Sequence, residues 1–221
     1  MSVVETAPSG ERLYPRPSLR RAAKMVRRNL LSYKHYWIAF VSGFFEPIFY
    51  LTAVGFGVGQ FVDSVPYKGL ELEYAAFLAP GMLAAATMNG ALFDGFFSLF
   101  FKLNWMKIYE GIITTPMNIA DIAVGELMWG VIRATTYGFG LVDSWWGLLA
   151  IPAVVLSSAA HVSGAMIFTF VSKEITLLEK VMTLVVLPMF LFSGIFFPLD
   201  RLPEWAQTVA WFVPLHQAVN M

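Results

Sequence analysis

Long apolar stretches separated by short polar connections dominate the chain from about residue 37 onward. Each stretch is close to the ~20 residues that an α-helix needs to cross the hydrocarbon of a bilayer at ~1.5 Å per residue. The pattern therefore predicts an all-α polytopic membrane protein with five transmembrane helices. The predicted spans cover residues 37–59, 74–101, 119–142, 147–171 and 175–197.

Ahead of the first span, the pattern changes to that of an amphipathic helix. Residues 1–17 are polar and contain prolines, which predicts a disordered cytosolic tail. From Ser18, a favourable N-cap residue, apolar positions recur every three or four residues through residues 18–35. This spacing is typical of an interfacial helix lying on the membrane, while a basic flank that only fixes topology is a compatible, simpler interpretation. The basic face consists of Arg20, Arg21, Lys24, Arg27 and Arg28.

The last part of the chain, residues 198–221, lacks the pattern of a further span. Prolines interrupt it, and the residues after Pro203 are too few and too polar for a transmembrane helix. We expect a short re-entrant element at the outer surface. The transmembrane domain, residues 36–221, is accordingly expected to end before a sixth span.

Composition and charge agree with a membrane protein. The chain is 57% hydrophobic and 14% charged, with a mean hydropathy of +0.64, outside the usual range of soluble domains. The net charge of zero gives no indication of nucleic acid as a partner. In the predicted topology twelve basic residues fall on the side of the N-terminus, and two, Lys68 and Arg201, fall on the other. The positive-inside rule therefore predicts a cytosolic N-terminus.

The connection between the second and third spans, residues 102–118, faces the cytosol in this topology and is longer than a simple turn requires. Its apolar positions would give a short helix a face to bury. The X-Pro bond at 115–116 is expected to end that helix and to direct the chain into the third span. We predict a docking element here, with an ordinary solvated loop as the alternative. Its residues are Trp105, Lys107, Tyr109, Glu110, Gly111, Thr115 and Pro116.

Ionisable residues inside the predicted spans are costly and usually functional. Counted along their helices, Glu46, Asp94 and Glu126 each lie roughly 10–14 Å from the cytosolic edge. His161 comes at about 15 Å, and Arg133 lies roughly two turns further out on the face of Glu126. We expect one polar layer that lines the translocation route or a subunit interface. The alternative is that these side chains only satisfy backbone groups and helix contacts.

Three sequence blocks occur in a fixed order: FLAPGMLAAATMNGALFDGFF, YEGIITTPMNIADIAVGELMWG and LPMFLFSGIFFPLDRLPEWAQ. Together they resemble the membrane subunit of type-2 ABC exporters, most closely the NodJ and drug-resistance permease branch. The resemblance implies six spans per subunit and a location in the bacterial cytoplasmic membrane. It also implies a homodimer or a pair with a paralogous permease, and a separate nucleotide-binding ATPase subunit. ATP and Mg²⁺ would bind to that partner, so no cofactor is expected in this chain.

The resemblance further implies roles for particular segments. Residues 102–118 would be the coupling helix that receives force from the ATPase, and residues 18–35 would form the second contact. The outer gate would comprise Gly194, Pro198, Leu202 and Pro203.

The function expected from this resemblance is outward export of an amphiphile, such as a drug, a lipid or a lipo-oligosaccharide, with membrane lipid as a further partner. A membrane enzyme is disfavoured because no catalytic cluster is evident, and the chain's three histidines offer no metal site. A proton-coupled secondary transporter that uses the acidic layer remains the alternative, although the sequence shows no internal repeat.

Overall fold

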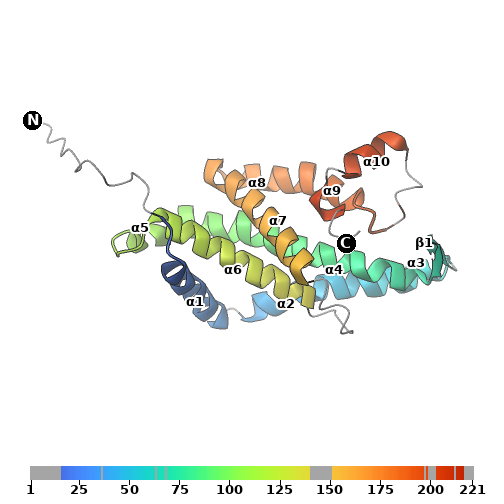
Figure 1. The fold of residues 1–221 in the computed structure, drawn as a ribbon, viewed down its shortest axis with the longest axis horizontal. Helices are drawn as coiled ribbons and strands as arrows, with labels where there is room; N and C mark the ends of the chain where they lie inside the picture. Colours follow the sequence, from blue (N-terminus) through green and yellow to red (C-terminus); the bar gives the residue numbers. More distant parts are fainter. Residues whose placement is uncertain are drawn as a thin grey trace, which may run out of the picture.

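The protein is predominantly helical, and its long helices form an elongated bundle (Figure 1). A two-stranded antiparallel hairpin is the one departure from the expected all-α class within the described part of the chain. The computed structural model describes residues 16–35, 37–62, 64–67, 69–139, 151–196, 198, 203–211 and 213–216.

Several of the long helices contain π-helical turns, so that one continuous helical segment carries more than one label. The helix α2 continues through a π-helical turn into α3, and α8 continues through another into α9. The helix α4 runs on through two such turns and ends at Trp105. The bounds are α1 Leu19–His35, α2 Trp37–Tyr50, α3 Gly57–Gly59, α4 Tyr74–Phe93, α5 Ile108–Ile112, α6 Ile119–Phe139, α7 Ile151–Val171, α8 Ile175–Val181, α9 Leu187–Leu191 and α10 Glu204–Trp211.

Two helical segments within the described residues, Tyr74–Trp105 and Ile151–Val171, are long and apolar enough to cross a membrane. Helical segments also occupy the other three ranges in which spans were expected, 37–59, 119–142 and 175–197. The count of five spans and the re-entrant C-terminal element remain predictions. Most of the expected N-terminal tail, residues 1–15, and the connection at 140–150 lie outside the described residues.

The helix α4 is the centre of the bundle. It packs against α2, α6 and α7 and buries most of its residues, among them Leu78, Met82 and Met88. Small residues allow the close approach of neighbouring helices. A Cβ atom on Gly95, in the π-helical turn after α4, would overlap the Cβ of Ala165 on α7. These contacts fix α4, α6 and α7 as one packed unit.

The hairpin joins α3 to α4 at the end of the bundle opposite α5 (Figure 1). Its strands are β1 Val65–Tyr67 and β2 Leu70–Leu72, with Tyr67 paired to Leu70 across the turn. Gly69 in the turn has a φ of 80°, a conformation that glycine adopts without strain. The sequence analysis did not predict this hairpin.

Candidate functional site

The N-terminal helix α1 packs along the first half of α6. Its buried stripe, Ala22, Met25 and Asn29, has the three-to-four spacing of one helix face. This stripe meets Gly125 of α6, where an added Cβ atom would lie 2.5 Å from the Met25 Cβ and 3.0 Å from the Ala22 carbonyl oxygen. Glycine at position 125 therefore lets the two helix backbones approach closely.

A buried carboxylate, Asp121, ties the beginning of α1 to the beginning of α6. It accepts hydrogen bonds from the backbone N–H groups of Ser18 (2.7 Å) and Asn118 (3.1 Å), and it pairs with Arg21. The Asn118 side chain accepts the N–H of Asp121 in return (2.8 Å), which makes a reciprocal cap on α6. Because the carboxylate also lies at the positive end of the α6 dipole, its charge is well compensated.

A second buried carboxylate, Glu126, receives donors from two other helical segments. Lys102, beyond α4, lies 2.7 Å from its Oε2 atom, and Arg28 of α1 lies 3.3 Å from its Oε1 atom. The Asn29 amide also donates to Oε2 (3.0 Å). Burial, and then the neighbouring Glu126 carboxylate, raise the pKa of the Tyr109 phenol far above its usual range, so Tyr109 is neutral.

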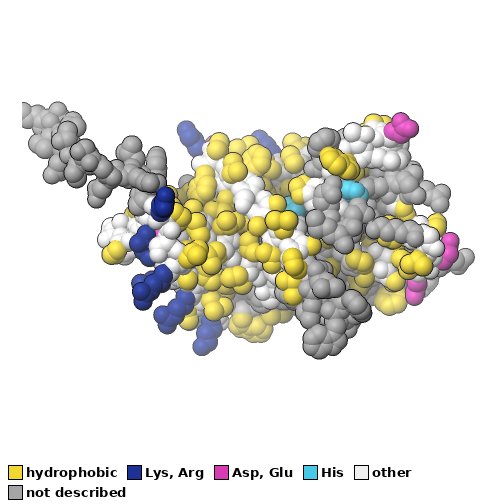
Figure 2. Space-filling view, viewed as in Figure 1, with side chains coloured by type: hydrophobic (Ala, Val, Ile, Leu, Met, Phe, Trp, Pro, Cys, Tyr) yellow, Lys and Arg dark blue, Asp and Glu magenta, His cyan; other side chains and the backbone are white. Residues whose placement is uncertain are grey.

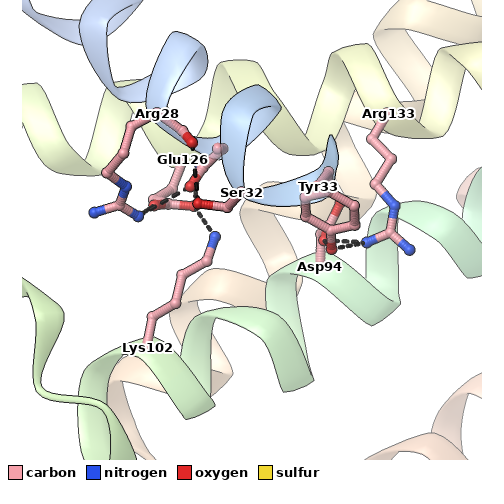
Figure 3. Close-up of polar contacts among 8 residues, drawn as sticks. Arg28, Ser32, Tyr33, Asp94, Lys102, Glu126 and Arg133 are labelled. Atoms are coloured by element: carbon pink, nitrogen blue, oxygen red, sulfur yellow. Dashed lines mark hydrogen bonds and ion pairs between the residues drawn. The ribbon is translucent and has the colours of Figure 1, made fainter. Parts of the chain in front are cut away.

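A third buried cluster centres on Arg133, further along α6 (Figure 3). Arg133 pairs with Asp94, and both side chains are only 5% exposed. Its guanidinium also donates to the hydroxyls of Tyr33 on α1 (2.6 Å) and Tyr137 on α6 (2.9 Å). The guanidinium carbon lies 4.8 Å from the centre of the Tyr33 ring, which adds a cation–π contact. Tyr33 therefore connects α1 to this ion pair.

These clusters replace the single polar layer that we expected. Asp94 lies opposite Arg133, and Lys102 lies opposite Glu126, so the two carboxylates belong to different levels of the bundle. The two levels are about 10–12 Å apart, since seven residues separate Glu126 from Arg133 and eight separate Asp94 from Lys102. The depth count ended the second helix at Phe101, whereas the helix continues to Trp105, which accounts for about 6 Å of this offset. The register between the two antiparallel helices accounts for the rest.

Of the other two members of the expected layer, only His161 has a described side chain, and it joins neither cluster. The side chain of Glu46 lies outside the described residues. His161 on α7 is buried, and its Nδ1 atom lies 2.7 Å from the backbone carbonyl of Ser157, one turn earlier on its own helix. This contact corresponds to the alternative that polar side chains at depth satisfy backbone groups.

The expected docking element, residues 102–118, is only partly a separate helix. Trp105 closes the helical extension of α4, and Lys107 turns the chain with a φ of 49° into the short helix α5. Tyr109 anchors α5 in the core, whereas Glu110 and Gly111 are exposed. The other exposed residues of this segment are Asn104, Trp105, Met106, Lys107, Ile113, Thr114, Thr115 and Pro116. We call this exposed surface the knuckle.

The basic face of α1 divides into two groups. Arg21 and Arg28 turn toward α6 and pair with the buried carboxylates described above. Arg20, Lys24 and Arg27 are exposed to solvent. The helix therefore has a cationic flank that holds it to the bundle and a second cationic face that points away from the bundle.

The expected outer gate lies near the end of α9, but its role stays a prediction. Gly194 has a φ of 87° and lies three residues after the end of α9, while Pro203 is exposed just before α10. Pro198 is half-buried, and Leu202 lies outside the described residues. His216 contacts the Ser193 carbonyl (3.0 Å) and so links the C-terminal segment to the end of α9.

Sequence reasoning missed several residues of this site. Asp121 could have been found, because Asn118 and Asp121 flank a helix start three residues apart, the spacing of a reciprocal cap. Lys102 stands at the start of the predicted connection, and its role appears only once the helix continues past it. Tyr33 and Asn29 gave no signal, since they look like ordinary positions of an amphipathic helix.

Comparisons with known proteins identify the class. The family model of ABC-2 type transporters matches residues 22–221. The chain therefore belongs to this family of membrane transport proteins, a membership that implies association with an ATP-binding subunit and a role in transport rather than catalysis. The predicted resemblance is confirmed.

Within the family the chain belongs to the NodJ branch. It is 31% identical to Nodulation protein J of Rhizobium leguminosarum bv. viciae over 205 residues, which cover 88% of this chain and 78% of the relative. It is 32% identical to Nodulation protein J of Rhizobium meliloti (strain 1021), covering 88% and 77%. The protein of the same name from Azorhizobium caulinodans is 23% identical over 208 residues, covering 90% and 80%. No solved structure matches the chain.

The Asp121 carboxylate provides a first test of the site. Asp121→Ala is expected to lower the free energy of unfolding by about 2–3 kcal/mol, because charge-assisted hydrogen bonds and a helix cap are lost together. Unfolding of the purified protein in detergent measures this change. Hydrogen exchange of the α1 amides should rise as well, and Asp121→Asn should have a smaller effect. Exchange in α1 equal to that of the unchanged protein would contradict the role assigned to Asp121.

Proposed function

We propose that the chain is the permease subunit of an ATP-driven exporter that moves an amphiphile outward across the bacterial cytoplasmic membrane. ATP is hydrolysed by the separate subunit, which docks on the knuckle. The observation that carries this proposal is the knuckle itself, an exposed surface at one end of the bundle whose anchor, Tyr109, packs beside the Glu126 cluster. Family membership supplies the driving partner.

The geometry supports a path for the force. A push on α5 acts on Tyr109, which is buried in one cluster with Met25 of α1 and Ile122 of α6. Because Glu126 is tied to α1 and to the extension of α4, these segments move together rather than singly. In this proposal the knuckle and α1 form one mechanical unit at the cytosolic end.

The distribution of charge supports a cytosolic position for this end. Lys and Arg side chains gather over α1, whereas the acidic side chains seen in this view lie near the hairpin and α10 at the opposite end (Figure 2). The helical segment Tyr74–Trp105 has 32 residues, about 48 Å in length, so it exceeds the ~30 Å hydrocarbon core. With Tyr74 at the outer boundary, Asp94 falls at the inner boundary and Lys102 in the headgroup region.

The nature of the cargo and the pairing of subunits follow from the same surface chemistry. Large apolar side chains are exposed along α2, α7 and α9, for example Phe49, Phe170 and Leu187. Such surfaces suit lipid chains, a second permease subunit or an amphiphilic cargo, and they suit a hydrated sugar channel poorly. We propose a homodimer or a pair with a paralogue, which carries a drug, a lipid or a lipo-oligosaccharide.

The proton-coupled alternative is not favoured by the observed contacts. A proton carrier needs a carboxyl group that is free to change its protonation state along the transport route. Asp94 is paired with Arg133, and Glu126 is paired with Lys102 and Arg28. These pairs fit a structural role for the two carboxylates.

Transport in proteoliposomes that contain this chain and its ATPase partner tests the proposal. We expect export to require ATP, to stop when the catalytic glutamate of the ATPase is replaced, and to continue when a protonophore collapses the proton gradient. Uptake of a fluorescent amphiphile into inside-out vesicles provides the measurement. Export that persists with the inactive ATPase and stops with the protonophore would establish the secondary transporter instead.

A further inference from the structure

The face of α1 that points away from the bundle carries a cationic stripe. Arg20, Lys24, Arg27 and Lys34 follow one another at steps of four, three and seven residues, which places them along one side of the helix. This side is opposite the buried stripe of Ala22, Met25 and Asn29. All four side chains are exposed, and no carboxylate of the described residues forms an ion pair with them.

Exposed leucines border the cationic stripe. Leu19, Leu30 and Leu31 expose 73%, 60% and 53% of their surface, although they belong to a helix that is otherwise well packed on one side. The transfer of an apolar side chain from water into an apolar medium lowers the free energy. These leucines gain this stabilisation only when another molecule covers them. The occupant of this face therefore offers negative charge and apolar groups next to each other.

The position of α1 fixes the height of the stripe in the membrane. A single residue separates the end of α1 at His35 from the start of α2 at Trp37, so α1 cannot move far from the first apolar segment. Tyr33 is held at the level of Arg133, and Ser18 is held at the level of Asp121. The stripe thus extends from the inner boundary of the hydrocarbon through the headgroup region.

We propose that this stripe binds the headgroups of anionic phospholipids in the cytosolic leaflet, while the bordering leucines reach the acyl chains. The membrane placement in this inference rests on the proposed function. Anionic lipid matches both the cationic stripe and the exposed leucines, since polybasic helices with an apolar side bind membranes that contain such lipid. An acidic surface of the ATPase would match only the charges and would leave the leucines in water.

The lipid clamp has a consequence for the bundle. The opposite flank of α1 is fixed to α6 through Arg21 and Arg28, so lipid and bundle hold the helix from two sides. Anionic lipid then sets the position of α1, and through it the position of the Glu126 and Arg133 clusters. This makes the lipid a structural partner of the permease.

Binding of phosphatidylglycerol to the purified full chain in detergent tests the inference, with phosphatidylcholine as the reference lipid and native mass spectrometry as the readout. The test variant is Lys24→Gln, Arg27→Gln and Lys34→Gln combined. The matched control is Lys107→Gln, Lys173→Gln and Lys180→Gln combined, which removes the same charge from other exposed positions. Because each Lys or Arg near an anionic surface contributes about fivefold, the test variant should bind phosphatidylglycerol about 100-fold more weakly.

The outcomes separate the possible occupants. Selective loss in the test variant, with phosphatidylcholine binding unchanged and the control close to the unchanged protein, supports the lipid clamp. Equal loss in both variants, or no preference for phosphatidylglycerol in the unchanged protein, overturns it. Retained lipid binding with lost capture of the ATPase would assign the stripe to that subunit. Lipid binding is measured without nucleotide or cargo, so its failure is distinguishable from failure of the proposed exporter function.

Discussion

Replacing Arg133 by methionine is expected to destabilise the folded protein by about 3–5 kcal/mol, because it leaves the buried Asp94 carboxylate without its cation. Asp94 is only 5% exposed, and Arg133 is the cation that contacts it directly. The hydroxyls of Tyr33 and Tyr137 lose their shared donor at the same time. Reversible unfolding in mixed micelles measures the free energy of unfolding, and this change should be the largest of any single substitution at the site.

The matched controls separate loss of the pair from loss of side-chain volume. Arg16→Met removes an exposed arginine that precedes α1 and should change the free energy of unfolding by less than about 0.5 kcal/mol. The double variant Asp94→Leu with Arg133→Met removes both charges and should recover most of the stability, since replacing a whole buried ion pair by apolar groups is often neutral. A double variant that is less stable than Arg133→Met alone would contradict this account.

The predominantly helical architecture could be predicted because hydrophobic length and helix-breaking residues determine it locally. The end of the second helix could not be predicted in this way. Lys102 and Asn104 make the sequence after Phe101 look like a loop. The helix continues because Lys102 finds the Glu126 carboxylate on a neighbouring helix, a contact between segments that are distant in the sequence.

In the candidate site, too, some contacts depend on neighbouring residues and others on segments that are distant in the sequence. The cap formed by Asn118 and Asp121 is local and has a sequence signature. The partner of that cap, the Ser18 backbone, is 103 residues away, and only the packing of α1 on α6 brings it into place. Likewise, the relative depth of Asp94 and Glu126 depends on the register between two antiparallel helices. The hydrophobic pattern within each helix gives no information about that register.

The exposed surface around α5 gives the prediction with the largest expected effect on transport. An added Cβ atom on Gly111 meets nothing within 4 Å, so a large side chain at this position extends away from the bundle. Gly111→Trp is therefore expected to leave folding unchanged while it obstructs the docking of the ATPase. ATP-dependent export should fall at least about tenfold, as a loss of about 1.4 kcal/mol in docking free energy suffices for this. Vesicle transport assays and capture of the ATPase measure the two effects.

The control for this variant is Gly57→Trp. Gly57 lies at the start of α3, is exposed, and also has open space around an added Cβ atom. It belongs to the segment that leads to the hairpin, at the end of the bundle opposite the knuckle (Figure 1). Both variants introduce the same side chain into a helix, so a difference between them reports on position rather than on hydrophobicity. If Gly111→Trp exports as well as Gly57→Trp and still captures the ATPase, force enters the permease elsewhere than at the knuckle.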